Sequence, residues 1–371
     1  MTLQIDIHII QSVPPSNMNR DDTGSPKTAF YGGVRRARVS SQAWKRATRK
    51  DFAAYLDASA VGVRTKRAVE LLTARIQKLR PETELADAQK MAMETLKVVN
   101  IGTKPTRRAK DTPAEAEQTE YLIFYSNLQL DRVAELAVAS LDGPLDKKAV
   151  KDALNADNSF DVALFGRMVA NAPDINVDAA CQVAHALSTH AVANEFDYYT
   201  AVDDQNPKEE TGAGMIGTVE FNSATLYRYA TVNVRALADN LGDPEATARA
   251  VQAFVRSFVS SMPTGKQNTF ANGTLPDAVV VMAREGRAVN LVGAFEDPVT
   301  SASGGFASAS VEALARQAKE VTQFVPAPTD TWVVTLPSRA SALADLGDIV
   351  SLDALVELVG ERVRAAVPDP S

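Results

Sequence analysis

The chain has 371 residues, of which 45% are hydrophobic and 23% charged. This is the composition of an ordinary globular protein, with room for one large domain or two to three smaller ones. It has no run of about 18 apolar residues and no charged N-terminal segment followed by an apolar block, so we expect neither membrane insertion nor secretion, and a cytoplasmic location. A single cysteine, Cys181, excludes an internal disulfide and agrees with a reducing compartment.

The positive charge is concentrated at one end of the chain. Residues 1–50 hold nine Lys and Arg against three Asp, a net charge of +6, whereas residues 51–371 hold 30 basic and 43 acidic residues, a net charge of −13. The total of −7 argues against a nucleic-acid partner, because phosphate binding normally requires a positive surface. The asymmetry instead fits one anion-binding face on a solubilising remainder, although basic segments are often only solvated surface.

The first part of the chain predicts a strand, a long loop and a helix. Residues 3–9 alternate apolar and polar side chains, which predicts a half-buried strand with one apolar and one mixed face. Residues 13–33 are rich in Pro, Asn, Asp and Gly and predict a long loop, which in a compact fold is usually functional. Ser40 or Ser41 then offers an N-cap to a predicted helix over residues 42–56.

Two further regions stand out along the middle of the chain. Helical periodicity from about residue 61 to residue 181 predicts a helical insertion, interrupted at residues 102–113 by a connector with four basic residues, Lys104, Arg107, Arg108 and Lys110. Residues 203–217 form a polar, Gly-rich loop between two aromatic segments, which is the composition of a projecting hairpin or arm.

The last third of the chain mixes strands and helices. Residues 244–260 predict an amphipathic helix, and a final helix is predicted over residues 352–366. Strands are predicted at residues 278–282 and 331–336. Strands at both ends of the chain with helices between them indicate an α+β domain whose sheet is completed by distant segments.

The segment 16–50 carries the most chemical information. Gln42, Lys45, Arg46 and Arg49 recur at three- and four-residue spacing and therefore share one helix face that can follow a phosphate backbone. The preceding loop holds Arg20 and Lys27, and the turn holds Gly32 and Gly33, which permit close backbone approach. A solvated basic helix explains the same pattern about equally well.

Two other groups raise the question of a metal site. The adjacent Asp21 and Asp22 could hold a divalent ion that activates water, but two carboxylates alone are weak support, and we interpret them as acceptors that order the loop. Cys181, His185 and His190 are spaced by four and then five residues, so His190 leaves the shared helix face and a fourth ligand is not evident. We expect a buried cysteine and hydrogen-bonded histidines, no metal and no cofactor.

Several separated blocks resemble the CasC family, the backbone subunit of type I-E CRISPR Cascade (CT1975-like). The blocks follow the family's order over most of the chain, and six in matching order are more specific than any single motif. The first block lies within residues 19–46 and comprises 19–22 (NRDD), 30–33 (FYGG), 35–38 (RRAR) and 40–42 (SSQ) followed by Lys45 and Arg46. The other five are residues 166–168 (GRM), 184–190 (AHALSTH), 200–204 (TAVDD), 217–221 (GTVEF) and 265–267 (GKQ).

The resemblance implies an α+β protein with an RRM-like (ferredoxin-like) palm, an inserted helical fingers domain and a projecting thumb hairpin. The implied division is palm at 1–60, 182–195 and 222–371, fingers at 61–181 and thumb at 196–221. The palm is expected to grip phosphates of the guide RNA, while Met168 and the thumb residues Tyr199 and Thr200 wedge against a displaced base. The implied RNA-binding residues are Arg20, Lys27, Ser40, Gln42, Lys45, Arg46, Arg49, Arg167, Met168, Tyr199, Thr200, Lys266 and Gln267.

The implied partners are those of a filament subunit and not of an enzyme. They are the crRNA, the target DNA strand, further copies of the chain stacked head to tail, the Cascade large and small subunits, the handle-binding subunit and the crRNA-processing endonuclease subunit. A metal-dependent ribonuclease using Asp21 or Asp22, as in related type III subunits, and a general single-strand-binding protein are the alternatives. At residues 297–304 this chain reads DPVTSASG where family members carry lysines, so any nucleic-acid contact there is in doubt.

Overall fold

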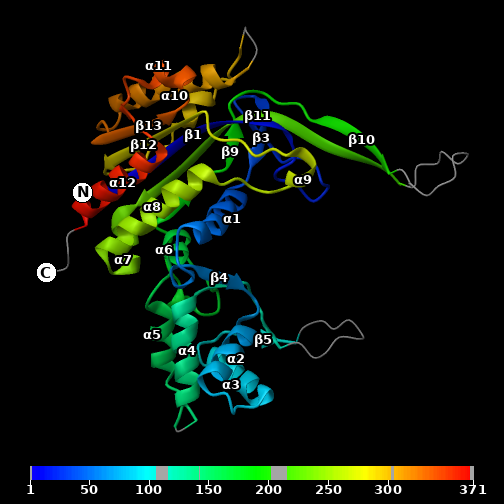
Figure 1. The fold of residues 1–371 in the computed structure, drawn as a ribbon, viewed down its shortest axis with the longest axis vertical. Coiled ribbons are helices and arrows are strands. Elements are labelled where there is room, and N and C mark those ends of the chain that lie inside the picture. Colours follow the sequence, from blue (N-terminus) through cyan, green and yellow to red (C-terminus); the bar gives the residue numbers. More distant parts are fainter. Residues whose placement is uncertain (1, 106–115, 142, 202–214, 302–304, 368–371) are drawn as a thin grey trace, which may run out of the picture. The chain divides into compact units, whose positions relative to one another are not determined.

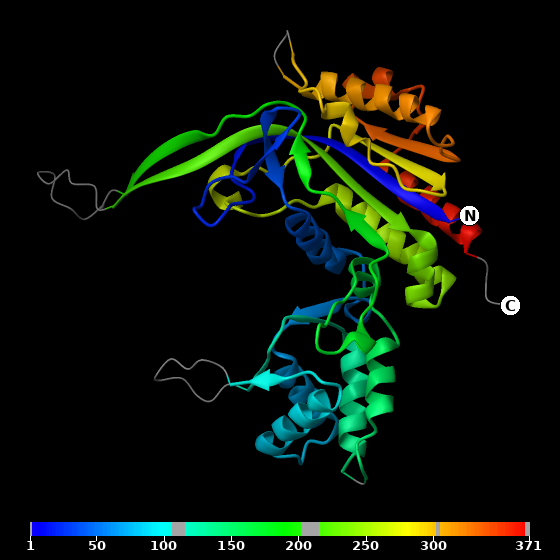
Figure 2. The ribbon, with the colours of Figure 1, turned by 180° about the vertical axis from the view of Figure 1, so that it is seen from behind.

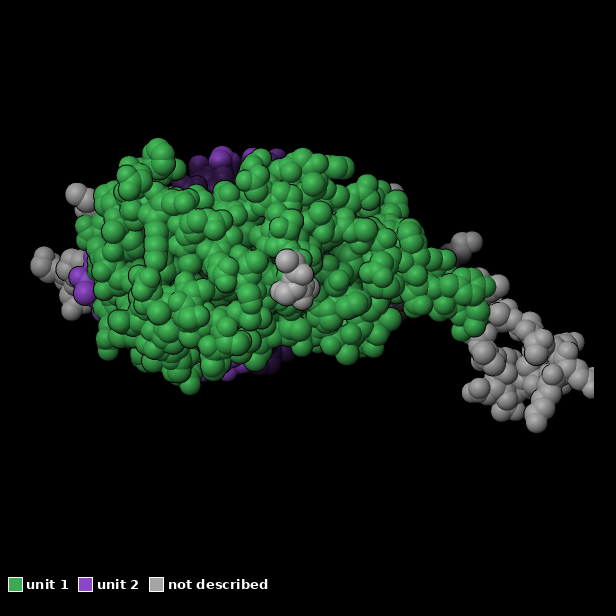
Figure 3. Space-filling view, turned by 90° about the horizontal axis from the view of Figure 1, so that it is seen from above, with its two compact units in different colours: residues 1–51, 183–232, 252–362 green, residues 52–182, 233–251, 363–371 purple. Residues whose placement is uncertain are grey.

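The structure is a computed structural model that describes residues 2–105, 116–141, 143–201, 215–301 and 305–367. It contains two compact units, coloured separately in Figure 3. Unit 1 comprises residues 1–51, 183–232 and 252–362, and unit 2 comprises residues 52–182, 233–251 and 363–371. The segment predicted as the fingers, residues 61–181, lies within unit 2, which also takes in residues 52–60, 182, 233–251 and 363–371 from the segments predicted as palm. None of the described helices has the length and apolar composition needed to cross a membrane.

Unit 1 is built on one large sheet (Figures 1 and 2). The strand order is β14-β13-β12-β1-β11-β9-β3-β2, and β8 and β10 pair with β11 outside this path. Strand β12 lies between β1 and β13 and pairs antiparallel with both. Strand β14 pairs with β13 in parallel. The strands are β1 (Leu3–Ser16), β2 (Thr28–Tyr31), β3 (Val34–Val39), β8 (Cys181–Val183), β9 (Ala186–Ser188), β10 (Glu195–Ala201), β11 (Met215–Asn233), β12 (Ala278–Glu285), β13 (Asp330–Thr335) and β14 (Asp348–Ile349).

Helices cover both faces of this sheet. On one face, the core packs η4 (Leu291–Phe295), α10 (Ala307–Glu320) and α11 (Ala340–Leu343) against β1, β11, β12 and β13. Helix α1 (Ser41–Asp51) lies on the opposite face (Figures 1 and 2). Helices α8 (Pro244–Ser260) and α12 (Leu352–Ala366) have the predicted bounds, and short α9 spans Gln267–Phe270. The strands predicted at residues 278–282 and 331–336 are confirmed as β12 and β13.

Strand β1 is buried on both faces, and the prediction of a half-buried strand is wrong. Its polar side chains are sealed under α10 and η4 because they find partners there: the hydroxyl of Tyr229 donates to Asp6 Oδ1 at 2.9 Å, and His8 Nδ1 lies 2.9 Å from the Tyr227 hydroxyl. Burial lowers the pKa of His8 to about 3. The strand also continues to Ser16 and β2 begins at Thr28, so the predicted loop shrinks to the segment between them.

Unit 2 has a helical core but contains two small sheets that the helical periodicity did not predict. Strand β4 (Gly62–Thr65) pairs with β7 (Ile123–Ser126), and β5 (Thr103–Lys104) pairs with β6 (Gln118–Thr119). Three of the basic connector residues, 107, 108 and 110, lie outside the described residues. The helices are α2 (Ala68–Leu79), α3 (Leu85–Val98), α4 (Asn127–Ala139), α5 (Lys147–Asn155), α6 (Phe160–Phe165) and α7 (Val234–Leu241), with η1 (Phe52–Ala54), η2 (Ala58–Ala60) and η3 (Pro173–Ile175).

Helix α1 is anchored to unit 1 by a buried arginine between two aromatic rings. The guanidinium carbon of Arg228 lies 3.8 Å from the ring centre of Trp44 and 4.6 Å from that of Phe258. Arg228 Nη1 donates to Gln11 Oε1 at 2.6 Å, and Nη2 donates to the Phe258 carbonyl. Burial lowers the pKa of Arg228 to about 9, which still leaves it protonated near neutral pH. The one tryptophan of α1 therefore fixes where its exposed face lies.

We predict that Trp44→Ala lowers the free energy of unfolding of unit 1 by about 3–5 kcal/mol, because it leaves a cavity and uncovers a buried cation. Trp44→Phe should cost less, since a ring stays under Arg228 and Trp44 Nε1 has no hydrogen-bond partner to lose. Urea unfolding followed by fluorescence checks this, because Trp332, the only other tryptophan, lies buried in the same unit. Equal midpoints for Trp44→Ala and the unmodified chain would refute the anchoring role.

Candidate nucleic-acid interface

Helix α1 presents a polar, basic face opposite its anchor. Ser40 is the N-cap, as predicted: its Oγ accepts from the Ala43 N–H at 3.4 Å and its carbonyl accepts from the same N–H at 3.0 Å. The helix ends at Asp51, five residues earlier than predicted, and η1 follows it. Trp44 and Thr48 are buried, and the opposite face carries the four predicted residues, Gln42 and Arg46 exposed and Lys45 and Arg49 partly exposed.

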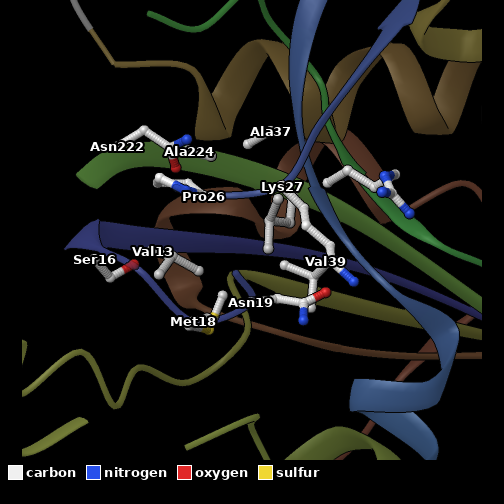
Figure 4. A pocket seen from close by; sticks show the side chains of 12 residues that line it. Val13, Ser16, Met18, Asn19, Pro26, Lys27, Ala37, Val39, Asn222 and Ala224 are labelled. Carbon is white, nitrogen blue, oxygen red and sulfur yellow. The ribbon is translucent and has the colours of Figure 1, made fainter. Parts of the chain in front are cut away.

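The loop before β2 is tied to the start of α1. The Asn19 side-chain Oδ1 accepts from the Ser40 N–H at 2.8 Å, and its carbonyl accepts from the Lys27 N–H at 2.8 Å. The Lys27 carbonyl accepts from the Arg38 N–H at 2.9 Å. Asn19, Lys27 and Arg38 thus line one hollow (Figure 4), and Arg20 lies exposed beside Asn19. The structure therefore brings the basic loop and the start of the basic helix together on one side of unit 1.

Asp21 orders this loop. Its Oδ1 accepts from the Thr23 hydroxyl at 2.7 Å and from the backbone N–H groups of Thr23 and Ser25 at 2.9 and 3.0 Å. These bonds, that from the Thr23 hydroxyl above all, lower the pKa of the Asp21 carboxyl. The interpretation of Asp21 as a loop acceptor is confirmed. Within the described residues no three His, Cys, Asp or Glu side chains gather where they could hold a metal ion.

The segment around Gly265 closes the other side of α1. A Cβ on Gly265 would lie 2.1 Å from the Met18 carbonyl oxygen, so only glycine allows this approach of the loop. A hollow of about 480 Å³ separates the loop from α1, with Arg46 and Lys50 on its helix side. Lys266 and Gln267 follow Gly265 in sequence. Lys266 is partly exposed and has a backbone φ of +53°, and Gln267 is exposed. The predicted pair is therefore next to the basic helix.

Gly32, in the β2–β3 turn, serves the protein's own packing, whereas a Cβ on Gly33 would have nothing within 4 Å. Gly32 has φ +57°, and a Cβ there would lie 1.6 Å from the Glu296 carbonyl oxygen. Arg36 is fully buried beneath the turn, and its guanidinium donates to the carbonyls of Tyr31, Ser188 and Phe295 at 2.8–3.1 Å. The close approach expected at this turn is thus to residues 295–296. Residues 302–304, in the segment that departs from the family pattern, lie outside the described residues.

Arg167 is placed differently from the RNA-binding role expected of it. It is 4% exposed, and its guanidinium donates to the carbonyls of Ile175, Leu154 and Phe124 and to Gln129 Oε1, all within unit 2. These acceptors hold the side chain inside the unit, away from any phosphate. Met168, the next residue, is 84% exposed and stays available for a base contact.

The predicted arm is a pair of antiparallel strands, β10 and β11, that extends beyond the rest of unit 1 (Figure 1). Residues 202–214, which come between the two strands in sequence, lie outside the described residues. Tyr199 pairs in register with Gly217, and a Cβ on Gly217 would lie 2.4 Å from the tyrosine ring. The ring therefore covers the glycine across the hairpin. Thr200 is exposed, and Phe196 and Tyr198 are 67% and 63% exposed.

His185 and His190, the two histidines considered as zinc ligands, have other partners. His190 Nδ1 donates to the Ala191 carbonyl at 2.9 Å, and its Nε2 accepts from the Thr225 N–H at 3.1 Å, so both ring nitrogens are engaged. His185 is exposed, and its Nδ1 lies 3.3 Å from Arg38 Nη1. Cys181 is buried, as expected.

Sequence reasoning missed three residues that lie at this surface: Arg38, Lys50 and His185. Spacing along the helix could have found Lys50, which follows Arg46 by four residues. Arg38 and His185 are 147 residues apart in sequence, and only the sheet brings them together. Within the described chain, no carboxylate lies within 4.0 Å of the charged groups of Arg20, Lys27, Arg38, Arg46 or Lys50.

Known proteins resemble the chain along almost its whole length. The model of a family described as CT1975-like protein matches residues 5–358. A chain in a solved structure of a "CRISPR RNA-guided surveillance complex, pre-nicking" is 34% identical, with a TM-score of 0.83 over 96% of this chain and 100% of that chain. A chain in a "CRISPR RNA-guided surveillance complex" is 30% identical, with a TM-score of 0.73 over 96% and 99%. No curated protein sequence matches.

Proposed function

Because this chain belongs to the CT1975-like family, we propose that it is the non-catalytic backbone subunit of a CRISPR RNA-guided surveillance complex of the Cascade type. In this role several copies stack head to tail along one crRNA and present its bases to a target DNA strand. The likeness to chains of such complexes at 30% and 34% identity over nearly the full length supports the assignment.

The observation that carries the proposal is a strip of cations on unit 1 that its own carboxylates do not neutralise. Arg20, Lys27 and Arg46 have no acidic partner within the described chain, although the whole chain is acidic. Repulsion among them costs free energy, which a bound polyanion relieves. Along α1 the strip lies beside Gln42, Lys45 and Arg49, and Lys266 and Gln267 lie next to the helix.

Contacts to phosphate are the appropriate chemistry for such a subunit. Every guide carries the same backbone, so a phosphate grip holds all spacers equally and leaves Watson–Crick pairing to read the target. The side chains of the strip are Arg, Lys and Gln, which donate hydrogen bonds to phosphate oxygens. We therefore expect the chain to bind RNA of any sequence and to leave recognition of the target to base pairing.

We further propose that unit 1 is an RRM-like palm with the β10–β11 hairpin as thumb and that unit 2 is the fingers. Tyr199 and Thr200 on the hairpin of one copy then reach into the site of the next copy, where they and that copy's Met168 wedge against a base displaced from the guide. The exposure of Met168 supports this assignment, because a thioether at the surface can pack against any base. The large and small subunits, the handle-binding subunit and the processing endonuclease are the further partners proposed.

We predict that replacing Lys45 and Arg49 together by Ala weakens binding of single-stranded RNA of any sequence. Each lost phosphate contact lowers the slope of log affinity against log salt by about 0.7, so the double variant should lose about 1.4. Fluorescence anisotropy at several salt concentrations with two unrelated RNAs measures both quantities.

The matched control is Arg67→Ala with Arg235→Ala, which removes the same charge from two exposed residues of unit 2 that pair with Glu70 and Asp239. This control should keep the salt slope. A loss confined to one RNA sequence, or an equal loss in the control, would contradict the phosphate grip.

We predict that Tyr199→Ala with Met168→Ala changes the chemical reactivity of the bound guide. In the unmodified complex, displaced bases should react at regular intervals along the RNA, and the double variant should blur this pattern and lose about 1–3 kcal/mol per base contact. Tyr198→Ala, on the opposite side of the same strand, is the control and should retain the pattern. Uniform reactivity of the guide in the unmodified complex would overturn the thumb assignment.

A further inference from the structure

We infer that Arg38 is a further phosphate-binding residue of the strip and that His185 is a positioning residue that aims its guanidinium. This inference rests on the proposed function and extends it to two residues outside the basic helix and its companion loop. The geometry of unit 1 assigns the role.

The guanidinium of Arg38 is held from two sides. Its Nε donates to the Thr28 carbonyl at 3.2 Å, and its Nη1 donates to His185 Nδ1 at 3.3 Å. A guanidinium has five N–H donors, so three remain, and none has an acceptor within the described chain. Their planar fork matches the oxygens of a phosphate.

Arg38 also lies where a phosphate chain along the strip would pass. It lines the same hollow as Lys27 and Asn19, and it comes two residues before the N-cap of α1. Its backbone N–H donates to the Lys27 carbonyl, so the two cations stand on paired segments. A phosphate contacted by Lys27 is therefore a neighbour of Arg38.

His185 acts in its neutral form. Arginine only donates hydrogen bonds, so Nδ1 of His185 is the acceptor and its ring proton is on Nε2. Desolvation, and then the charges of Arg38 and Lys27, lower the pKa of His185, which favours the neutral ring. Since His185 is exposed on the surface, its replacement leaves the core intact.

The test uses the full chain and two unrelated single-stranded RNAs, with affinity measured against salt. Arg38→Gln should lower the salt slope by about 0.7 and weaken both RNAs equally. The control is Arg35→Gln on the same strand, which removes the same charge from a guanidinium that lies 5.9 Å from the Phe30 ring centre. That control should keep the slope.

The positioning role has its own readout. His185→Ala should weaken binding several-fold without changing the unfolding midpoint, whereas His185→Asn, whose amide oxygen can replace Nδ1 as acceptor, should restore most of the affinity. If His185→Asn binds as weakly as His185→Ala, the positioning role is wrong.

The remaining outcomes separate this inference from the proposed function. If Arg38→Gln matches Arg35→Gln while the Lys45 and Arg49 variant still loses slope, Arg38 is no phosphate contact and the proposed function stands. If none of these variants changes the slope, the proposed function itself fails, and this inference fails with it.

Discussion

The buried guanidinium of Arg228 is the interaction on which the candidate interface depends. A protonated arginine inside a core must be stabilised by contacts that replace water. Here Trp44 and Phe258 cover the faces of the guanidinium, and Gln11 and a backbone carbonyl accept its hydrogen bonds. The cation comes from β11, one ring from α1 and the other from α8, so a single contact joins three elements. Helix α1 can present a row of cations only because its opposite side is fixed in this way.

Contacts of Arg36, Gly32 and Asn19 fix the turn and the loop that lie beside helix α1. Arg36 draws the carbonyls of three segments together beneath the β2–β3 turn, and Gly32 admits residue 296 to within a distance that no side chain allows. Asn19 ties the preceding loop to the N-cap. Arginine therefore has two separate uses in residues 20–49: Arg36 holds the framework, whereas Arg20, Arg38 and Arg46 have no carboxylate partner within the described residues. The remainder of the chain, residues 51–371, has a net charge of −13.

Much of this arrangement follows from sequence because local rules govern it. Ser40 caps α1, residues 244–260 and 352–366 form helices, and the face of α1 follows from 3.6-residue periodicity. The failures have a common physical origin in tertiary contacts. Asp6 and His8 look solvent-facing until Tyr229 and Tyr227 arrive from more than 200 residues away, and Arg167 looks like a phosphate ligand until four acceptors of unit 2 enclose it. The sequence alone does not distinguish a buried arginine from an exposed one. Arg38 and His185 come together only because strands β3 and β9 pair in the sheet.

In the proposed function, repeated copies of this chain coat RNA by binding its phosphates, without reading the RNA sequence. Sedimentation of the chain with single-stranded RNAs of increasing length tests it most directly. The number of bound copies should rise in equal steps with RNA length and should be the same for unrelated sequences. A single copy bound at every length, or assembly on one sequence only, would contradict it.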